Sequence, residues 1–161
     1  MLSERVLQYE RSLSKLAVLM ADECSESANA DDLRDELADI EYKMTEEETE
    51  FVAGLSSDLY MIEDDEILDP PADHTDFDFA WHYGWKDWLK CLELLRRESP
   101  NCSNECRAFY RGEIYSKLEC YSSALEFYRW AIKLNNMKLN YYYKFIVCFI
   151  AQWKSKSHDS A

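Results

Sequence analysis

The chain has 161 residues, enough for one domain of ordinary size with its own apolar core and no need of disulfides or a metal ion for folding. Gly and Pro number only three each, and because sandwiches and barrels use many of both in their turns, the composition predicts an all-α protein. The formal net charge of −14 argues against direct binding to nucleic acid or to an anionic membrane surface.

The first predicted region, residues 1–69, is acidic and begins with a helical hairpin. Apolar residues recur at alternating steps of four and three between Leu2 and Met20, which predicts a helix over about residues 3–24. The same spacing returns between Leu33 and Met44, after a small and polar stretch. Two such helices joined by a short polar segment form a hairpin.

A third, short helix is expected after this hairpin, over residues 46–53. Thr45 and Glu48 have the spacing of a capping box, in which each side chain binds the backbone N–H of the other residue. We expect Gly54 to end this helix, because glycine is the residue that most readily closes a helix. A further turn or two is expected near Leu59, before an acidic run that ends at Asp69-Pro70-Pro71.

The rest of the chain reads as an acidic linker, a second helical region and a polar tail. The linker is predicted over residues 70–78, the helical region over 79–154 and the tail over 155–161. Within the helical region the expected helices cover residues 79–95, 105–117, 122–134 and 139–154.

Small and aromatic residues follow a fixed pattern between positions 108 and 136. Gly112 is followed three residues later by Tyr115, and Ala124, Tyr128 and Ala131 stand 12, 16 and 19 positions after Gly112. Small residues let two helices approach closely, while the large ones beside them fill the space between the helices. With this pattern the segment AFYRGEIYSKLECYSSALEFYRWAIKLNN resembles one tetratricopeptide repeat (TPR), covering about residues 105–138.

The resemblance implies a pair of antiparallel helices within an array of such pairs, since one repeat cannot bury its own apolar faces. Residues 88–97 resemble the second helix of a preceding, degenerate repeat, with Cys91 in the small position 33 residues before Ala124. The amino-terminal acidic region is expected to pack on this array.

TPR proteins bind peptides or helices in a groove lined by the first helix of each repeat, so the resemblance implies a protein-binding groove here. The groove residues it implies are Phe109, Glu113, Ser116 and Lys117. Phe109 and Glu113 stand where chaperone-type members carry the Lys and Asn that bind a terminal carboxylate, so that mode is disfavoured. An outward Glu113 is expected to contribute little to stability.

The last predicted helix has apolar residues around nearly its whole circumference, although the end of an array normally keeps a polar outer face. We expect Tyr142, Phe145 and Phe149 on this helix to contact a partner. Three partners remain open: the amino-terminal hairpin, the same helix of a second copy in a homodimer, or a foreign protein.

The charges are unevenly divided along the chain. Residues 1–80 carry 5 basic and 24 acidic side chains, whereas residues 81–161 carry 13 basic and 8 acidic ones. Glu47, Glu50, Asp64 and Asp65 are the candidate acidic face. This face could contact the second half of the chain, or it could bind a basic protein or imitate nucleic acid, as small acidic inhibitor and immunity proteins do.

No catalytic, cofactor or metal-binding residues are predicted. The sequence lacks the motifs of nucleophilic elbows, phosphate loops and zinc proteases, and its six cysteines do not form paired short spacings. It also lacks the pattern of a secretory signal and an apolar run long enough to span a membrane. The sequence therefore predicts a cytoplasmic, non-enzymatic adaptor or regulatory protein, with the acidic inhibitor as the alternative.

Overall fold

The structure is a computed structural model, and it describes residues 1–22, 26–63, 77–96 and 103–159 of the chain. Within these ranges all the regular secondary structure is α-helical, so the all-α prediction is confirmed. The chain divides into two compact units, Met1–Tyr60 and Met61–Ala161.

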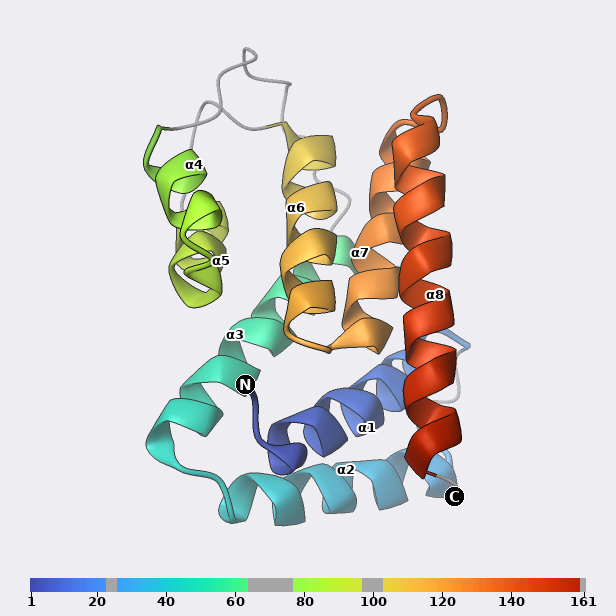
Figure 1. The fold of residues 1–161 in the computed structure, drawn as a ribbon. Helices are drawn as coiled ribbons and strands as arrows, with labels where there is room; N and C mark the ends of the chain where they lie inside the picture. The colour runs from blue at the N-terminus through green and yellow to red at the C-terminus, as the bar shows by residue number, and fades with distance from the viewer. Residues whose placement is uncertain (23–25, 64–76, 97–102, 160–161) are drawn as a thin grey trace. The chain divides into compact units, whose positions relative to one another are not determined.

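The first unit begins with the predicted helical hairpin, made by α1 (Glu4–Ala21) and α2 (Ala28–Tyr42), which run antiparallel in Figure 1. Ser3 and Ser27 start the two helices, because each hydroxyl oxygen accepts a hydrogen bond from a backbone N–H of the first turn. The hairpin is held by a small apolar core. Its members are Tyr9, Leu13, Leu16, Leu19, Ala30, Leu33 and Leu37.

The third helix, α3 (Glu46–Glu63), starts as predicted and ends much later than predicted. The backbone N–H of Thr45 donates to Glu48 Oε2 at 2.9 Å, and the N–H of Glu48 donates to Thr45 Oγ1 at 3.3 Å, which completes the capping box. The predicted end at Gly54 is wrong. Val52 and Leu55, which flank this glycine, are both buried, and their packing stabilises the helical conformation across it.

The second unit contains α4 (Phe77–Gly84), α5 (Trp88–Arg96), α6 (Asn104–Lys117), α7 (Tyr121–Leu134) and α8 (Leu139–Asp159). The α6–α7 pair matches the predicted helices to within a residue at each end. Two other predictions are wrong. The single helical stretch over residues 79–95 is broken between Gly84 and Trp88, and the last helix, expected to end at residue 154, continues to Asp159. Residues 70–76 of the predicted linker lie outside the described residues, and α4 begins at Phe77.

Helices α6 and α7 cross closely at the small residues that the sequence pattern singled out. A Cβ atom added at Gly112 would lie 2.8 Å from Cδ1 and Cε1 of Tyr128, closer than two such carbons can approach. Ala124 and Ala131 of α7 are completely buried. Tyr115 of α6 is also fully buried, stacked on Phe127 with ring centroids 5.4 Å apart.

The α4–α5 hairpin repeats the geometry of the α6–α7 hairpin. Lys86 and Glu119, 33 residues apart, have φ of 59° and 65°, the left-handed conformation that closes a helix. In each turn the next residue's N–H binds a carbonyl five residues back: Asp87 to His82, and Cys120 to Tyr115.

The ends of the helices share this 33-residue offset. Helices α4 and α6 end at residues 84 and 117, and α5 and α7 begin at residues 88 and 121. The buried positions of the second helices follow the same offset. They are Cys91, Leu92 and Leu95 in α5 and Ala124, Leu125 and Tyr128 in α7. The second unit therefore contains two successive helical hairpins with the same turn conformation and the same spacing of buried residues, followed by α8.

Candidate protein-binding site

A row of aromatic rings joins the first helices of the two hairpins and α8. Tyr110 of α6 contacts Phe79 and Tyr83 of α4, with ring centroids 5.0 Å and 5.5 Å apart. Its neighbour Phe109 stacks on Tyr141 of α8 at 4.9 Å. We call these five residues the aromatic row. The rings of this row come from α4, α6 and α8, so their contacts join three helices of the second unit.

An open cleft of about 400 Å³ lies between α6 and α8, at one end of the aromatic row. We call it the α6–α8 cleft. Its lining is mainly apolar, with the amide of Asn140 and the ammonium of Lys138 among the groups that line it. The lining residues are Cys106, Phe109, Tyr110, Lys138, Leu139, Asn140 and Tyr141.

A polar cluster around Glu105 fixes the start of α8 against α6. Tyr141 Oη and Lys138 Nζ each lie 2.5 Å from Glu105 Oε1, and Asn135 Nδ2 donates to Oε2 at 3.2 Å. Burial raises the pKa of the Glu105 carboxyl, but the hydrogen bonds from Lys138, Tyr141 and Asn135 outweigh burial and leave this pKa below its ordinary value. The charge of Lys138 is therefore already neutralised within the chain.

Glu113 does not lie outward in the groove, and in this respect the sequence expectation is wrong. Only 8% of the residue is exposed, and its carboxylate accepts hydrogen bonds from Tyr128 Oη at 2.5 Å and from Lys144 Nζ at 3.1 Å. Burial, followed by the charge of Glu113, raises the pKa of the Tyr83 hydroxyl to about 12. Glu113 thus links α6 to α4, α7 and α8, and its carboxylate serves these internal contacts and does not line the groove.

The other three residues of the predicted groove lie in different surroundings. Phe109 lines the α6–α8 cleft, half-buried within the aromatic row. Ser116 is half-buried and Lys117 is exposed at the end of α6, and neither lines the cleft.

The three predicted contact residues of the last helix do not share one environment. Tyr142 and Phe149 are exposed, whereas Phe145 is half-buried and lies beneath the guanidinium of Arg129, 5.3 Å from its ring centroid. Phe145 therefore packs within its own unit.

Most of the cleft residues are not predicted by the sequence pattern. Tyr110, Lys138, Leu139 and Tyr141 are among them, although the doublet at 109–110 and the tyrosine run at 141–143 stand out in the sequence. Such runs place aromatic side chains on several sides of a helix, so only the packing of α8 decides which of them enter the cleft.

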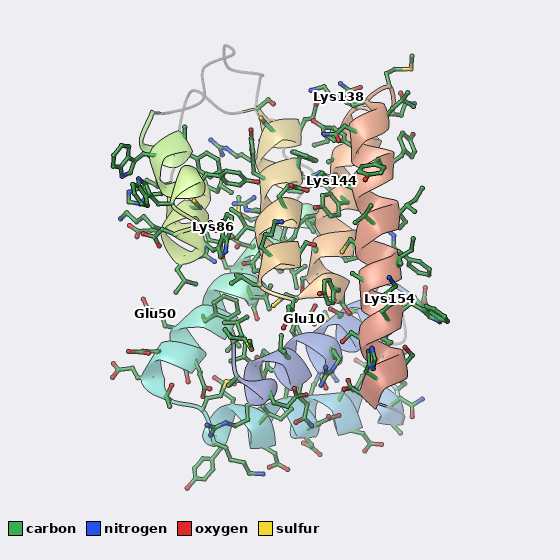
Figure 2. All side chains as sticks on the ribbon, in the orientation of Figure 1. Glu10, Glu50, Lys86, Lys138, Lys144 and Lys154 are labelled. Atoms are coloured by element: carbon green, nitrogen blue, oxygen red, sulfur yellow. The ribbon has the colours of Figure 1, made fainter. Side chains whose placement is uncertain are left out.

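The acidic residues of the first unit lie partly at the surface. Glu47 and Glu50 are exposed on α3, where Figure 2 labels Glu50, whereas Asp64 and Asp65 lie outside the described residues. Helices α1 and α2 also border a hollow of about 450 Å³, where four of the eight lining residues are acidic and two are basic. Its ionisable lining residues are Arg5, Asp32, Asp35, Glu36, Asp39 and Lys43.

Three further observations bear on function. In the part of the chain that the structure describes, no three His, Cys, Asp or Glu side chains gather as metal ligands would. Over the same residues, no helix is both long and apolar enough to cross a bilayer. No protein-family model, curated protein or solved structure matches this chain.

Proposed function

We propose that the protein is a non-enzymatic, TPR-like interaction module, an adaptor or regulatory subunit that binds a segment of a partner protein in the α6–α8 cleft. The cleft itself carries the proposal: it is open, mainly apolar and located beside the aromatic row. Binding sites are typically lined by apolar and aromatic side chains with a few polar groups, and the α6–α8 cleft has such a lining. The proposal includes a cytoplasmic location, where thiols stay reduced.

The partner segment that fits is apolar rather than acidic. A cleft of about 400 Å³ has room for one or two large side chains, and aromatic walls favour Leu, Phe or Trp as the anchor. The two lysines near this face, Lys138 and Lys144, already pair with Glu105 and Glu113. Neither is available as the main site for a partner's carboxylate, whereas Asn140 is exposed and can form a hydrogen bond at the rim.

A second function, binding of a basic protein by the acidic first unit, is supported by the exposed Glu47 and Glu50 and by the acidic hollow between α1 and α2. The two functions differ in their dependence on salt. Binding by an acidic surface weakens steeply as ionic strength rises, whereas binding by an apolar cleft does not.

The test starts from a partner captured from the native cells and then purified, with its affinity for the full chain measured by calorimetry. Asn140→Trp places a large side chain in the cleft, and we expect it to weaken binding at least tenfold. Lys154→Trp is the matched control, since it adds the same side chain at an exposed position of α8 outside the cleft (Figure 2). If Glu47→Lys with Glu50→Lys abolishes binding while Asn140→Trp has no effect, the acidic surface is the site and the cleft proposal is wrong.

A further inference from the structure

Helix α8 has two apolar faces, and only one of them packs within the described unit. Its inner face carries Tyr141 and Cys148, both buried, and is fixed to α7 by a hydrogen bond of 2.8 Å from Gln152 Nε2 to Ser122 Oγ. Its outer face carries seven large apolar side chains that are 39–82% exposed, which we call the outer stripe. The outer stripe consists of Leu139, Tyr142, Tyr143, Ile146, Phe149, Ile150 and Trp153.

The spacing of the outer stripe is that of a helix-packing seam. Positions 139, 142, 146, 149 and 153 follow one another at steps of three and four, as the a and d positions of a heptad do, and positions 143 and 150 fall on the adjoining e position. No charged residue interrupts the stripe, and Lys156 stands at the next d position and ends it. Such a stripe, about 22 Å long, is suited to one other helix lying along it.

The outer stripe is also symmetric about its centre. When the sequence is reversed around Ile146, position 139 falls on 153, position 142 on 150 and position 143 on 149. An antiparallel copy of α8 centred on Ile146 therefore places every stripe residue opposite another stripe residue. This symmetry is what a two-fold interface between identical helices requires, because the same patch must serve both copies.

The antiparallel arrangement is better than a parallel one on physical grounds. It places Trp153 of one copy beside the smaller Leu139 of the other, and Tyr142 beside the smaller Ile150. It also opposes the two helix dipoles, whereas a parallel pair would align them side by side.

The area of the outer stripe is sufficient for a stable dimer. Each of the seven side chains exposes on the order of 100 Å², so two copies would bury at most roughly 1,400 Å², which lies within the range of specific interfaces. Tyr142 can be covered without losing its hydrogen bond, since its hydroxyl donates to the backbone carbonyl of Asn136 at 3.1 Å.

From the spacing, the symmetry and the area, we propose that the protein forms a homodimer in which α8 packs antiparallel on α8 of a second copy, with the two-fold axis at Ile146. This interface uses the outer face of α8 and leaves most of the lining of the α6–α8 cleft free. It shares Leu139 with the lining of the cleft, but it does not depend on the function proposed above.

The first test is the oligomeric state of the full chain, measured by sedimentation over a range of concentrations up to about 100 μM. We expect a dimer. Ile146→Glu should raise the dissociation constant about a hundredfold or more, because the charge would be buried at the axis once from each copy. Circular dichroism should show unchanged helicity, since Ile146 is exposed in the single chain.

Val147→Glu is the matched control for this variant. Val147 is an exposed, β-branched residue of α8 next to Ile146, but it falls on position b, outside the outer stripe. We expect this variant to remain dimeric. A wild-type chain that is monomeric overturns the proposal, as does a dimer that survives Ile146→Glu, because another surface would then account for it.

The second test measures the orientation of the two helices. A photo-crosslinking residue at position 139 should label the other copy near Trp153, and a crosslink within one chain is excluded because the two positions lie about 21 Å apart along α8. Labelling near Leu139 of the other copy would show a parallel pair and would contradict the proposal.

Discussion

At the scale of single residues, Gly112 sets the distance between α6 and α7. We expect Gly112→Ala to lower the free energy of unfolding by about 1–3 kcal/mol, because the new methyl group overlaps the buried ring of Tyr128. This loss should exceed the gain of up to about 1 kcal/mol that alanine brings to a helix.

Gly84 is the control for this substitution. It ends α4, and a Cβ atom added there meets no atom within 4 Å. Gly84→Ala should therefore be neutral or stabilising in the same urea titration. Equal effects at the two glycines would contradict the close crossing at Gly112.

Glu113 is the residue whose position in the structure differs most from the position expected from the sequence. Glu113→Ala should cost about 1–3 kcal/mol, since it leaves the hydroxyl of Tyr128 buried without its acceptor and removes the ion pair with Lys144. Glu113→Gln should cost less, because the amide oxygen can still accept from Tyr128. Chemical denaturation measures the free energy of unfolding of both variants. If Glu113→Ala is as stable as wild type, Glu113 lies outward in the groove, as the sequence suggested.

Glu105 should make stability depend on pH in the acid range. The pKa of its carboxyl is lower in the folded protein than its ordinary value of 4.5, so the ionised form stabilises the fold. The contribution is complete above pH 4.5 and is lost as pH falls through the lowered pKa. Glu105→Gln should thus melt below wild type at pH 7, and the difference should shrink below pH 4.5. A difference that is constant down to pH 2.5 would contradict this role.

At the scale of elements, a substitution in each of the two hairpin turns should stabilise the fold. Lys86 and Glu119 both have positive φ, which costs an L-residue about 1–2 kcal/mol relative to glycine in the same conformation. Lys86→Gly and Glu119→Gly should each raise the free energy of unfolding by about 0.5–1 kcal/mol, since part of the gain is offset by the greater entropy of glycine in the unfolded chain.

Lys117→Gly is the control for the turns, because Lys117 lies within the last turn of α6 and is exposed. That substitution should be destabilising by up to about 1 kcal/mol. If glycine at 86 or 119 destabilises as glycine at 117 does, the two turns do not have the geometry described here.

The helices also show which boundaries the local sequence pattern can predict. The capping box at Thr45 and Glu48 and the bounds of α6 and α7 were predictable, because caps and apolar spacing act within one turn of helix. Continuation of α3 through Gly54 was not, because it depends on the burial of Val52 and Leu55. The break between α4 and α5 was missed because Lys86 is a left-handed residue that is not glycine.

At the scale of the whole molecule, charge should make stability depend on salt. Met1–Tyr60 has 5 basic and 16 acidic side chains, so its net charge is −11 and its acidic groups repel one another. We expect urea denaturation to show greater stability at 0.5 M than at 0.05 M NaCl, because screening relieves this repulsion.

Glu47→Lys with Glu50→Lys provides the control, because both residues are exposed and the double variant makes the charge of this unit less negative by four. The variant should be more stable than wild type at low salt and should respond less to added salt. A loss of stability on adding salt would show instead that opposite charges attract one another within the folded chain.

The sequence by itself determined the helical class, the first hairpin, the α6–α7 pair and the close crossing at Gly112. All of these rest on neighbours three or four positions apart, or on a short pattern within one hairpin. Only the tertiary structure decided that Glu113 is buried, that Lys138 is paired and that a cleft opens between α6 and α8. The contacts responsible join residues about 30 positions apart, such as Glu113 with Lys144 and Glu105 with Lys138, and such pairs exist only once the helices have packed.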